Sequence, residues 1–97
     1  MVSLGNQDCV KSVIVANVYG LHARPAAEFV KLASKFESEI LVRKDTLEVN
    51  GKSIMGVMML AAERGSTIHI RARGTDAQQA VEALVRLVAD GFGEAYS

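Results

Sequence analysis

Alternating apolar and polar positions between Ser66 and Arg73 give the clearest strand pattern of the chain. One side of this segment is apolar and the other polar, with the inward side formed by Ile68, Ile70 and Ala72. The pattern therefore predicts a strand with one buried and one solvent-facing side. The β-branched run Val10–Val18 is apolar on both faces, which predicts a first strand in the middle of a sheet. The runs Glu39–Lys44 and Thr46–Val49 predict two short strands paired in a hairpin.

Apolar spacing and capping residues together predict three helices. In the first, apolar side chains recur three and four positions apart, at Ala26, Phe29, Val30, Ala33 and Phe36, as is typical of an amphipathic helix. A capping serine, Ser53, predicts a short second helix, which Gly56 weakens. The last helix is predicted to start near Thr75, because Thr75 and Gln78 have the spacing of a capping box. Gly91 can end this helix. The order βαββαβα indicates an α+β fold, with helices packed on a mostly antiparallel sheet.

The composition is that of one ordinary globular domain. The chain has 97 residues, of which 49% are apolar and 23% charged, and about 150 residues is typical of one domain. We expect a single domain over residues 1–97, with residues 1–8 as a loose tail. The longest apolar run, Ile54–Ala62, is shorter than the roughly 18 residues of a membrane span, and the first residues lack the pattern of a secretory leader. No membrane insertion is expected.

Charge and cysteine content narrow the partners and the compartment. Eleven Lys and Arg balance eleven Asp and Glu, and aromatic residues make up only 5% of the chain, so a nucleic-acid partner is not expected. Cys9 is the only cysteine and cannot form an internal disulfide, which favours the reducing cytoplasm. Cys9, His22 and His69 are too few and too scattered for a metal site. We expect no metal.

A histidine stands where the first predicted strand gives way to the first helix. It belongs to the segment Gly20–Ala26, GLHARPA, which contains His22, Arg24 and the only proline, Pro25. Proline has a preset φ and no amide hydrogen, so Pro25 places the helix start at His22 or Ala23. The free amides and the positive dipole at a helix start can bind a phosphate. The same positive end favours a neutral, nucleophilic imidazole. A guanidinium such as that of Arg24 binds phosphoryl oxygens well. The segment thus indicates a phosphoryl site, although an ordinary helix cap or surface histidine also fits it.

Two segments together, GLHARPA and VNGKSIMGVMMLAAERGS, closely resemble the HPr family, the histidine-containing phosphocarriers of the bacterial phosphoenolpyruvate-dependent phosphotransferase system. The resemblance covers about Val10 to Glu94. It implies an open-faced β-sandwich, in which three helices cover one face of a four-stranded antiparallel sheet. It also implies that His22 takes a phosphoryl group from Enzyme I and passes it to EIIA proteins or domains, with Arg24 as phosphoryl partner and Pro25 shaping the site. Such a protein is a carrier rather than an independent enzyme, and it needs no cofactor.

The same resemblance assigns roles to the second predicted helix. Ser53 resembles the serine that HPr kinase/phosphorylase modifies, and a phosphate there would place repulsive charge beside a docking surface and weaken acceptance at His22. Ile54, Met55 and Met58 resemble positions that dock Enzyme I and EIIA, and methionines re-pack readily against unlike partners. Apolar residues at helical spacing are also typical of a core. Burial in the core and exposure on a docking surface therefore both stay open for these three residues. The carrier is expected to be a monomer.

Two alternatives remain beside a sugar phosphocarrier. The stretches Met59–Ala62 and Gly91–Glu94 resemble the nitrogen-related branch of the family, whereas Lys52–Met58 resembles the kinase-regulated sugar carriers. A small-molecule-binding regulatory module is the alternative from another class, because fold alone does not dictate function. The grouping of His22 with Arg24 argues against such a module.

Overall fold

Four strands and three helices alternate along the chain in the order βαββαβα. The computed structural model of the protein describes residues 7–94. Its elements, in chain order, are β1 (Gln7–Ile14), α1 (Ala23–Ala33), β2 (Glu39–Lys44), β3 (Leu47–Asn50), α2 (Ile54–Met59), β4 (Thr67–Gly74), α3 (Ala77–Ala89) and a short 3-10 turn, η1 (Gly91–Gly93). The predicted order of elements is confirmed.

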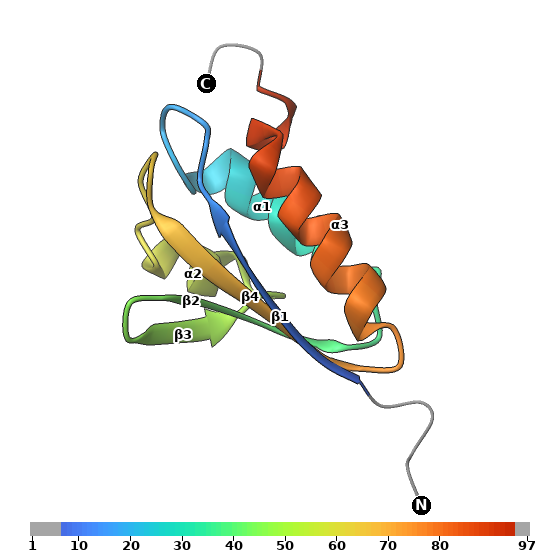
Figure 1. Ribbon diagram of the computed structural model, residues 1–97. Coiled ribbons are helices and arrows are strands. Elements are labelled where there is room, and N and C mark those ends of the chain that lie inside the picture. The colour runs from blue at the N-terminus through green and yellow to red at the C-terminus, as the bar shows by residue number, and fades with distance from the viewer. Residues whose placement is uncertain (1–6, 95–97) are drawn as a thin grey trace, which may run out of the picture.

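The strands form one antiparallel sheet in the order β1-β4-β2-β3. β4 lies in the middle, with Ile70 opposite Lys11 of β1 on one side and Val42 of β2 on the other. β2 and β3 form the predicted hairpin, with Val42 opposite Val49. The helices lie on one side of this sheet (Figure 1). The predicted open-faced β-sandwich, with one covered and one open sheet face, is therefore confirmed.

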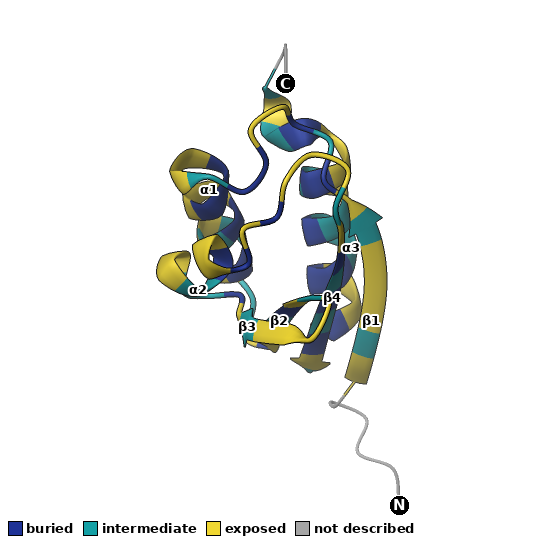
Figure 2. Ribbon diagram, turned by 90° about the vertical axis from the view of Figure 1, so that its left-hand side faces the viewer, coloured by how far each residue is buried: buried dark blue, intermediate teal, exposed yellow. Residues whose placement is uncertain are grey.

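The core lies between the sheet and the helices. Alternate residues of β4 point into it and are fully buried, namely Ile68, Ile70 and Ala72, as the alternating pattern predicts. The helices contribute their apolar stripes, with Phe29 of α1 and Leu84 of α3 both 0% exposed. In Figure 2 the dark blue, buried residues gather on the inner sides of α1 and α3. Removing this apolar surface from water stabilises the arrangement of helices on the sheet.

β1 is an edge strand, so the predicted central position of Val10–Val18 is wrong. It pairs with β4 alone, and its outer residues Val10 and Ile14 are 54% and 59% exposed. Figure 2 shows β1 yellow and teal along its length. The strand also ends at Ile14, four residues before the predicted end. β-branched residues favour an extended chain, but they do not determine how many strands pair with it.

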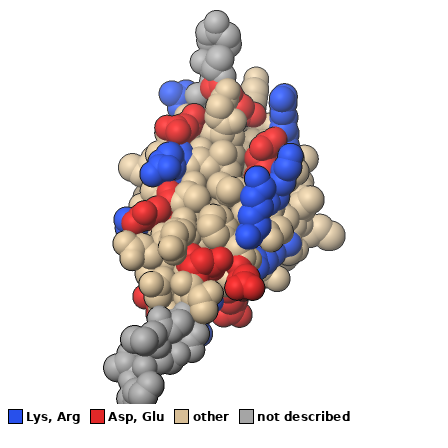
Figure 3. All heavy atoms as spheres, turned by 90° about the vertical axis from the view of Figure 1, so that its right-hand side faces the viewer, with Lys and Arg blue, Asp and Glu red and all other residues tan. Residues whose placement is uncertain are grey.

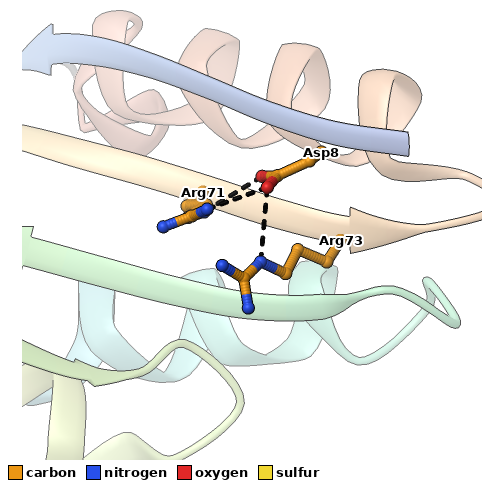
Figure 4. Close-up of polar contacts among 3 residues, drawn as sticks. All are labelled: Asp8, Arg71 and Arg73. Carbon is orange, nitrogen blue, oxygen red and sulfur yellow. Dashed lines mark hydrogen bonds and ion pairs between the residues drawn. The ribbon is translucent and has the colours of Figure 1, made fainter. Parts of the chain in front are cut away.

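Asp8 ties the start of β1 to β4. The Nε and Nη2 atoms of Arg71 donate hydrogen bonds of 3.0 and 2.8 Å to the two oxygens of Asp8, and Nε of Arg73 lies 3.4 Å from Oδ2 (Figure 4). The hydrogen bonds from Arg71, more than its charge, hold the pKa of Asp8 below its usual value. Gln7 and Asp8 thus belong to a strand, which corrects the loose tail expected for residues 1–8; residues 1–6 lie outside the described part of the chain.

The start of α3 differs from the predicted capping box. Asp76, not Thr75, is the N-cap residue, and the Asp76 side chain does not cap the helix. Its carboxylate instead accepts hydrogen bonds from the hydroxyl and amide of Ser38 and from the amide of Glu37. These bonds, with the hydroxyl of Ser38 first, lower the pKa of Asp76. The amide of Gln78 donates to the side chain of Gln7 at 3.1 Å, so this helix start is held by tertiary partners.

Charged side chains of both signs are interspersed on the side of the molecule that carries α3 (Figure 3). Within residues 7–94, no group of three or more His, Cys, Asp or Glu side chains is arranged to hold a metal ion. None of the helices in this range has the length and apolar character needed to cross a bilayer.

Candidate functional site

A tight turn between β1 and α1 presents His22. Its backbone closes through a 3.1 Å hydrogen bond from the amide of Gly20 to the carbonyl of Asn17, and the amide of Leu21 donates to the carbonyl of Ala62 at 2.9 Å. Gly20 has a φ of +66°, and a Cβ there would lie only 2.2 Å from the oxygen of Ala62. Glycine is therefore required by both the backbone conformation and the close approach. Leu21 is buried beside it, so the residue before the histidine is anchored in the core.

His22 is the N-cap of α1, as the position of Pro25 predicts. Its backbone is extended, with φ −76° and ψ −174°, and its side chain makes no capping hydrogen bond. The first helical bond runs from the amide of Ala26 to the carbonyl of His22 at 2.9 Å. Amides in the first turn of a helix have no intrahelical acceptor, and proline has no amide hydrogen. The amides of Ala23 and Arg24 are thus the ones this helix start offers to an anion.

The two nitrogens of the His22 ring have different surroundings. The side chain is 40% exposed, but Nε2 is enclosed and has no hydrogen-bond partner among the described residues. The nearest carboxylate oxygen to Nε2 is Oε2 of Glu94, at 3.7 Å, which is too long for a hydrogen bond. The ring of Tyr19 meets the imidazole edge-on, with 6.0 Å between the ring centroids. Nε2 is therefore closed to an incoming group in this arrangement.

An open hollow lies beside this histidine. It is lined by Tyr19, Leu21, His22, Met58, Ala61, Ala62 and Glu63, so α2 contributes Met58 to the surroundings of His22. Arg24, in the first turn of α1, is exposed. The hydrogen bonds and ion pairs of arginine side chains among the described residues belong to Arg43, Arg71 and Arg73, so none engages the guanidinium of Arg24. Its charge is thus accessible next to the histidine.

Ser53 begins α2 as its N-cap residue, as predicted. Its hydroxyl oxygen accepts a 3.0 Å hydrogen bond from the amide of Gly56. Of the apolar residues that follow, Val57 is fully buried, whereas Ile54, Met55 and Met58 are 44%, 75% and 41% exposed. The core alternative left open for these three is therefore wrong, because α2 buries only a narrow stripe. Their surfaces are free for contact with another molecule within the described structure.

Two residues near His22 carry no local signal in the sequence. Asn17 is 0% exposed, and its side-chain amide donates to Oε1 of Glu94 at 3.1 Å, across 77 positions of the chain. A buried asparagine and a glutamate near the end of a chain are unremarkable until the fold brings them together.

The fold is shared with small phosphocarrier proteins of known structure. A solved structure of HPr-C-His from Thermoanaerobacter tengcongensis superposes with a TM-score of 0.85 and 48% sequence identity, covering 89% of this chain and 97% of that one. The family model described as the PTS HPr component phosphorylation site matches residues 9–90. This chain belongs to the HPr family, the phosphocarrier proteins of the phosphotransferase system.

Similar HPr sequences and structures agree with this assignment. The phosphocarrier protein HPr of Neisseria meningitidis serogroup A is 46% identical over 84 residues, which span 87% of this chain and 94% of the relative. A structure of an HPr dimer from Thermoanaerobacter tengcongensis is 53% identical with a TM-score of 0.72, covering 77% of this chain and 86% of that one. Because a relative has been solved as a dimer, the monomer expected for this chain stays a prediction.

Proposed function

We propose that this protein, as a single domain in the cytoplasm, receives a phosphoryl group on His22 from phosphorylated Enzyme I and passes it to EIIA proteins or domains. The observation that carries the proposal is the partly exposed imidazole at the N-cap of an eleven-residue helix, with one ring nitrogen enclosed. Membership of the HPr family supports the general role.

The chemistry requires a nucleophile, a cradle for the phosphoryl oxygens and a counter-charge. The lone pair of Nδ1 of His22 attacks phosphorus, the bond from phosphorus to the donor breaks, and the donor keeps that electron pair. The amides of Ala23 and Arg24 and the dipole of α1 stabilise the phosphoryl oxygens, and the guanidinium of Arg24 supplies two parallel donors. Pro25 is buried in the first turn, where it fixes the backbone that carries these amides.

Partner docking uses the exposed apolar residues of α2. Met58 lines the hollow next to His22, and Ile54 and Met55 are exposed on the same short helix. Thioether side chains adapt to different shapes at little cost, which suits a carrier that meets a donor and an acceptor in turn. The same surface can therefore serve both Enzyme I and EIIA.

Ser53 is the proposed regulatory site. It directly precedes the docking residue Ile54, and its side chain is partly exposed. Phosphorylation by an HPr kinase/phosphorylase adds close to two negative charges at the edge of the docking surface. Those charges oppose the approach of a negatively charged phosphoryl donor, so transfer to His22 slows.

Incubation with phosphoenolpyruvate and Enzyme I tests the carrier function. The wild-type protein is expected to gain one phosphoryl group that is lost in acid, as a phosphoramidate is, and His22→Ala is expected to gain none. The label should then move to an added EIIA protein. If the wild type takes up no phosphate under conditions that phosphorylate a known HPr, the carrier proposal fails and a small-molecule-binding regulatory module becomes the better account.

A further inference from the structure

A buried asparagine links the segment after α3 to the turn that presents His22. The Nδ2 atom of Asn17 donates to the carbonyl of Gly20 at 2.7 Å and to Oε1 of Glu94 at 3.1 Å. Both partners only accept hydrogen bonds, which fixes the orientation of the Asn17 amide. Gly20 lies in the turn that presents His22. One buried side chain therefore holds both that turn and the carboxylate of Glu94.

An unusual backbone turn brings Glu94 to this place. After α3 the three residues Gly91, Phe92 and Gly93 have φ values of +64°, +59° and +72°. A left-handed conformation is costly for a residue with a large side chain such as Phe92. Phe92 is nonetheless partly buried against the core, and the amide of Glu94 closes the turn on the carbonyl of Gly91 at 3.0 Å. Packing thus stabilises a strained turn, and this turn positions Glu94 beside Asn17.

The two oxygens of the Glu94 carboxylate face two different nitrogens. Oε1 accepts from Asn17, and Oε2 lies 3.7 Å from Nε2 of His22. The Glu94 side chain is only 20% exposed, and Nε2 is enclosed without another partner among residues 7–94. Contacts of this kind are often long in the resting state and shorten when charge develops during a reaction. A carboxylate only accepts, so Nε2 can approach it favourably only while carrying its proton.

We propose that Glu94 is a positioning residue for phosphoryl transfer, an inference that rests on the proposed role of His22. Its carboxylate, held by Asn17, keeps the proton of His22 on Nε2. The lone pair of the ring then resides on Nδ1, next to the amides at the start of α1. In the opposite tautomer Nδ1 carries the proton and cannot attack phosphorus.

The same carboxylate compensates the charge that transfer creates. When Nδ1 forms its bond to phosphorus and the donor leaves with the electron pair of the broken bond, the proton on Nε2 stays in place. The ring then carries a positive charge, and Oε2 of Glu94 is the carboxylate oxygen that faces it. On transfer to the acceptor the Nδ1–P bond breaks, its electron pair returns to Nδ1, and the ring is again neutral with its proton on Nε2.

Glu94→Gln gives a sharp test, because it keeps the shape of the side chain. Its single carbonyl oxygen stays with Asn17, so its NH2 group faces Nε2 and donates to a lone pair there. The favoured tautomer then changes. Long-range ¹H–¹⁵N NMR spectra of His22 should show the ratio of the Nε2–H to the Nδ1–H form falling by about two- to tenfold, the worth of one hydrogen bond. The rate of loading from phosphorylated Enzyme I should fall at least in proportion to the loss of the Nε2–H form.

Asp90→Asn is the matched control. Asp90 lies on the same segment and is exposed, and its side chain makes no capping hydrogen bond to the turn that follows. It removes the same charge without touching the ring, so tautomer ratio and loading rate should stay at wild-type values. Amide spectra of both variants check that the fold is retained.

The outcomes separate this inference from the carrier function. A changed tautomer ratio with slower loading in Glu94→Gln, but not in Asp90→Asn, supports the positioning role. An unchanged ratio in Glu94→Gln overturns it, whatever the rate, and leaves the carrier function intact if the wild type is phosphorylated. A wild-type protein that accepts no phosphoryl group overturns both.

Discussion

Replacing Gly20 by alanine should unfold the protein more readily and displace His22. Gly20 has a φ of +66°, and an added Cβ would lie 2.2 Å from the oxygen of Ala62 and 2.9 Å from Cα of Glu63. All three nearest atoms belong to backbone, so no side chain can rotate away. The turn itself has to move, together with the histidine that follows it.

The cost can be built from two contributions. A left-handed conformation costs a residue with a Cβ about 1–2 kcal/mol. Moving the turn away from Ala62 weakens the 2.9 Å hydrogen bond from the amide of Leu21, and the loss of one such bond costs about 1–2 kcal/mol more. Gly20→Ala should therefore lower the free energy of unfolding by about 2–4 kcal/mol, which for a chain of this length is a fall in Tm of roughly 10–25 °C.

Thermal and urea unfolding followed by circular dichroism measure this cost, and Gly65→Ala is the control. Gly65 also has a positive φ, +90°, but an added Cβ there would meet no atom within 4 Å. Its substitution should cost only the conformational strain. If Gly20→Ala and Gly65→Ala lower the free energy of unfolding equally, contact with Ala62 does not hold the turn that presents His22, and the reasoning is refuted.

Three further predictions concern docking, regulation and acid stability. Met55→Ala should slow transfer from Enzyme I while changing the free energy of unfolding by less than about 0.5 kcal/mol, because Met55 is 75% exposed; an unchanged transfer rate would remove it from the docking surface. Ser53→Asp should slow loading of His22 and Ser53→Asn should not, since both residues can cap α2 and only the first adds charge; equal rates would contradict electrostatic regulation. The pKa of Asp76 is lowered in the folded state by the hydroxyl of Ser38, so its stabilisation is present above the unfolded pKa of about 4 and is lost as the pH falls through the folded value. The stability difference between wild type and Asp76→Asn, measured by urea unfolding, should shrink on acidification, and a pH-independent difference would argue against this role of the carboxylate.

Local signals in the sequence predicted those parts of the fold that depend on local physics. The alternation around Ile68 and Ile70 predicted their burial, because strand geometry turns successive side chains to opposite faces. Pro25 predicted the start of α1 and Ser53 the start of α2, since both act through backbone groups within one helical turn. The position of His22 at the helix start followed from Pro25 alone.

Features that depend on distant partners were not predictable in this way. Asp76, rather than Thr75, is the N-cap residue of α3. Its carboxylate accepts hydrogen bonds from the amides of Glu37 and Ser38, which are 39 and 38 positions away. β1 lies at the edge of the sheet because β4 is its only partner strand, and β4 pairs with β2 on the side away from β1. The composition of β1 does not encode this strand order. Asn17 and Glu94 were not predicted either, because only the fold brings these two distant residues together. Their meeting depends on the strained turn after α3.

The most direct test of the phosphocarrier account is to find which atom bears the phosphoryl group. Uniformly ¹⁵N-labelled protein, loaded by Enzyme I and phosphoenolpyruvate, can be analysed by ³¹P and long-range ¹H–¹⁵N NMR. The account predicts a single phosphoryl group on Nδ1 of His22, with the proton retained on Nε2 beside Glu94. A phosphoryl group on Nε2, or on any residue other than His22, would contradict it.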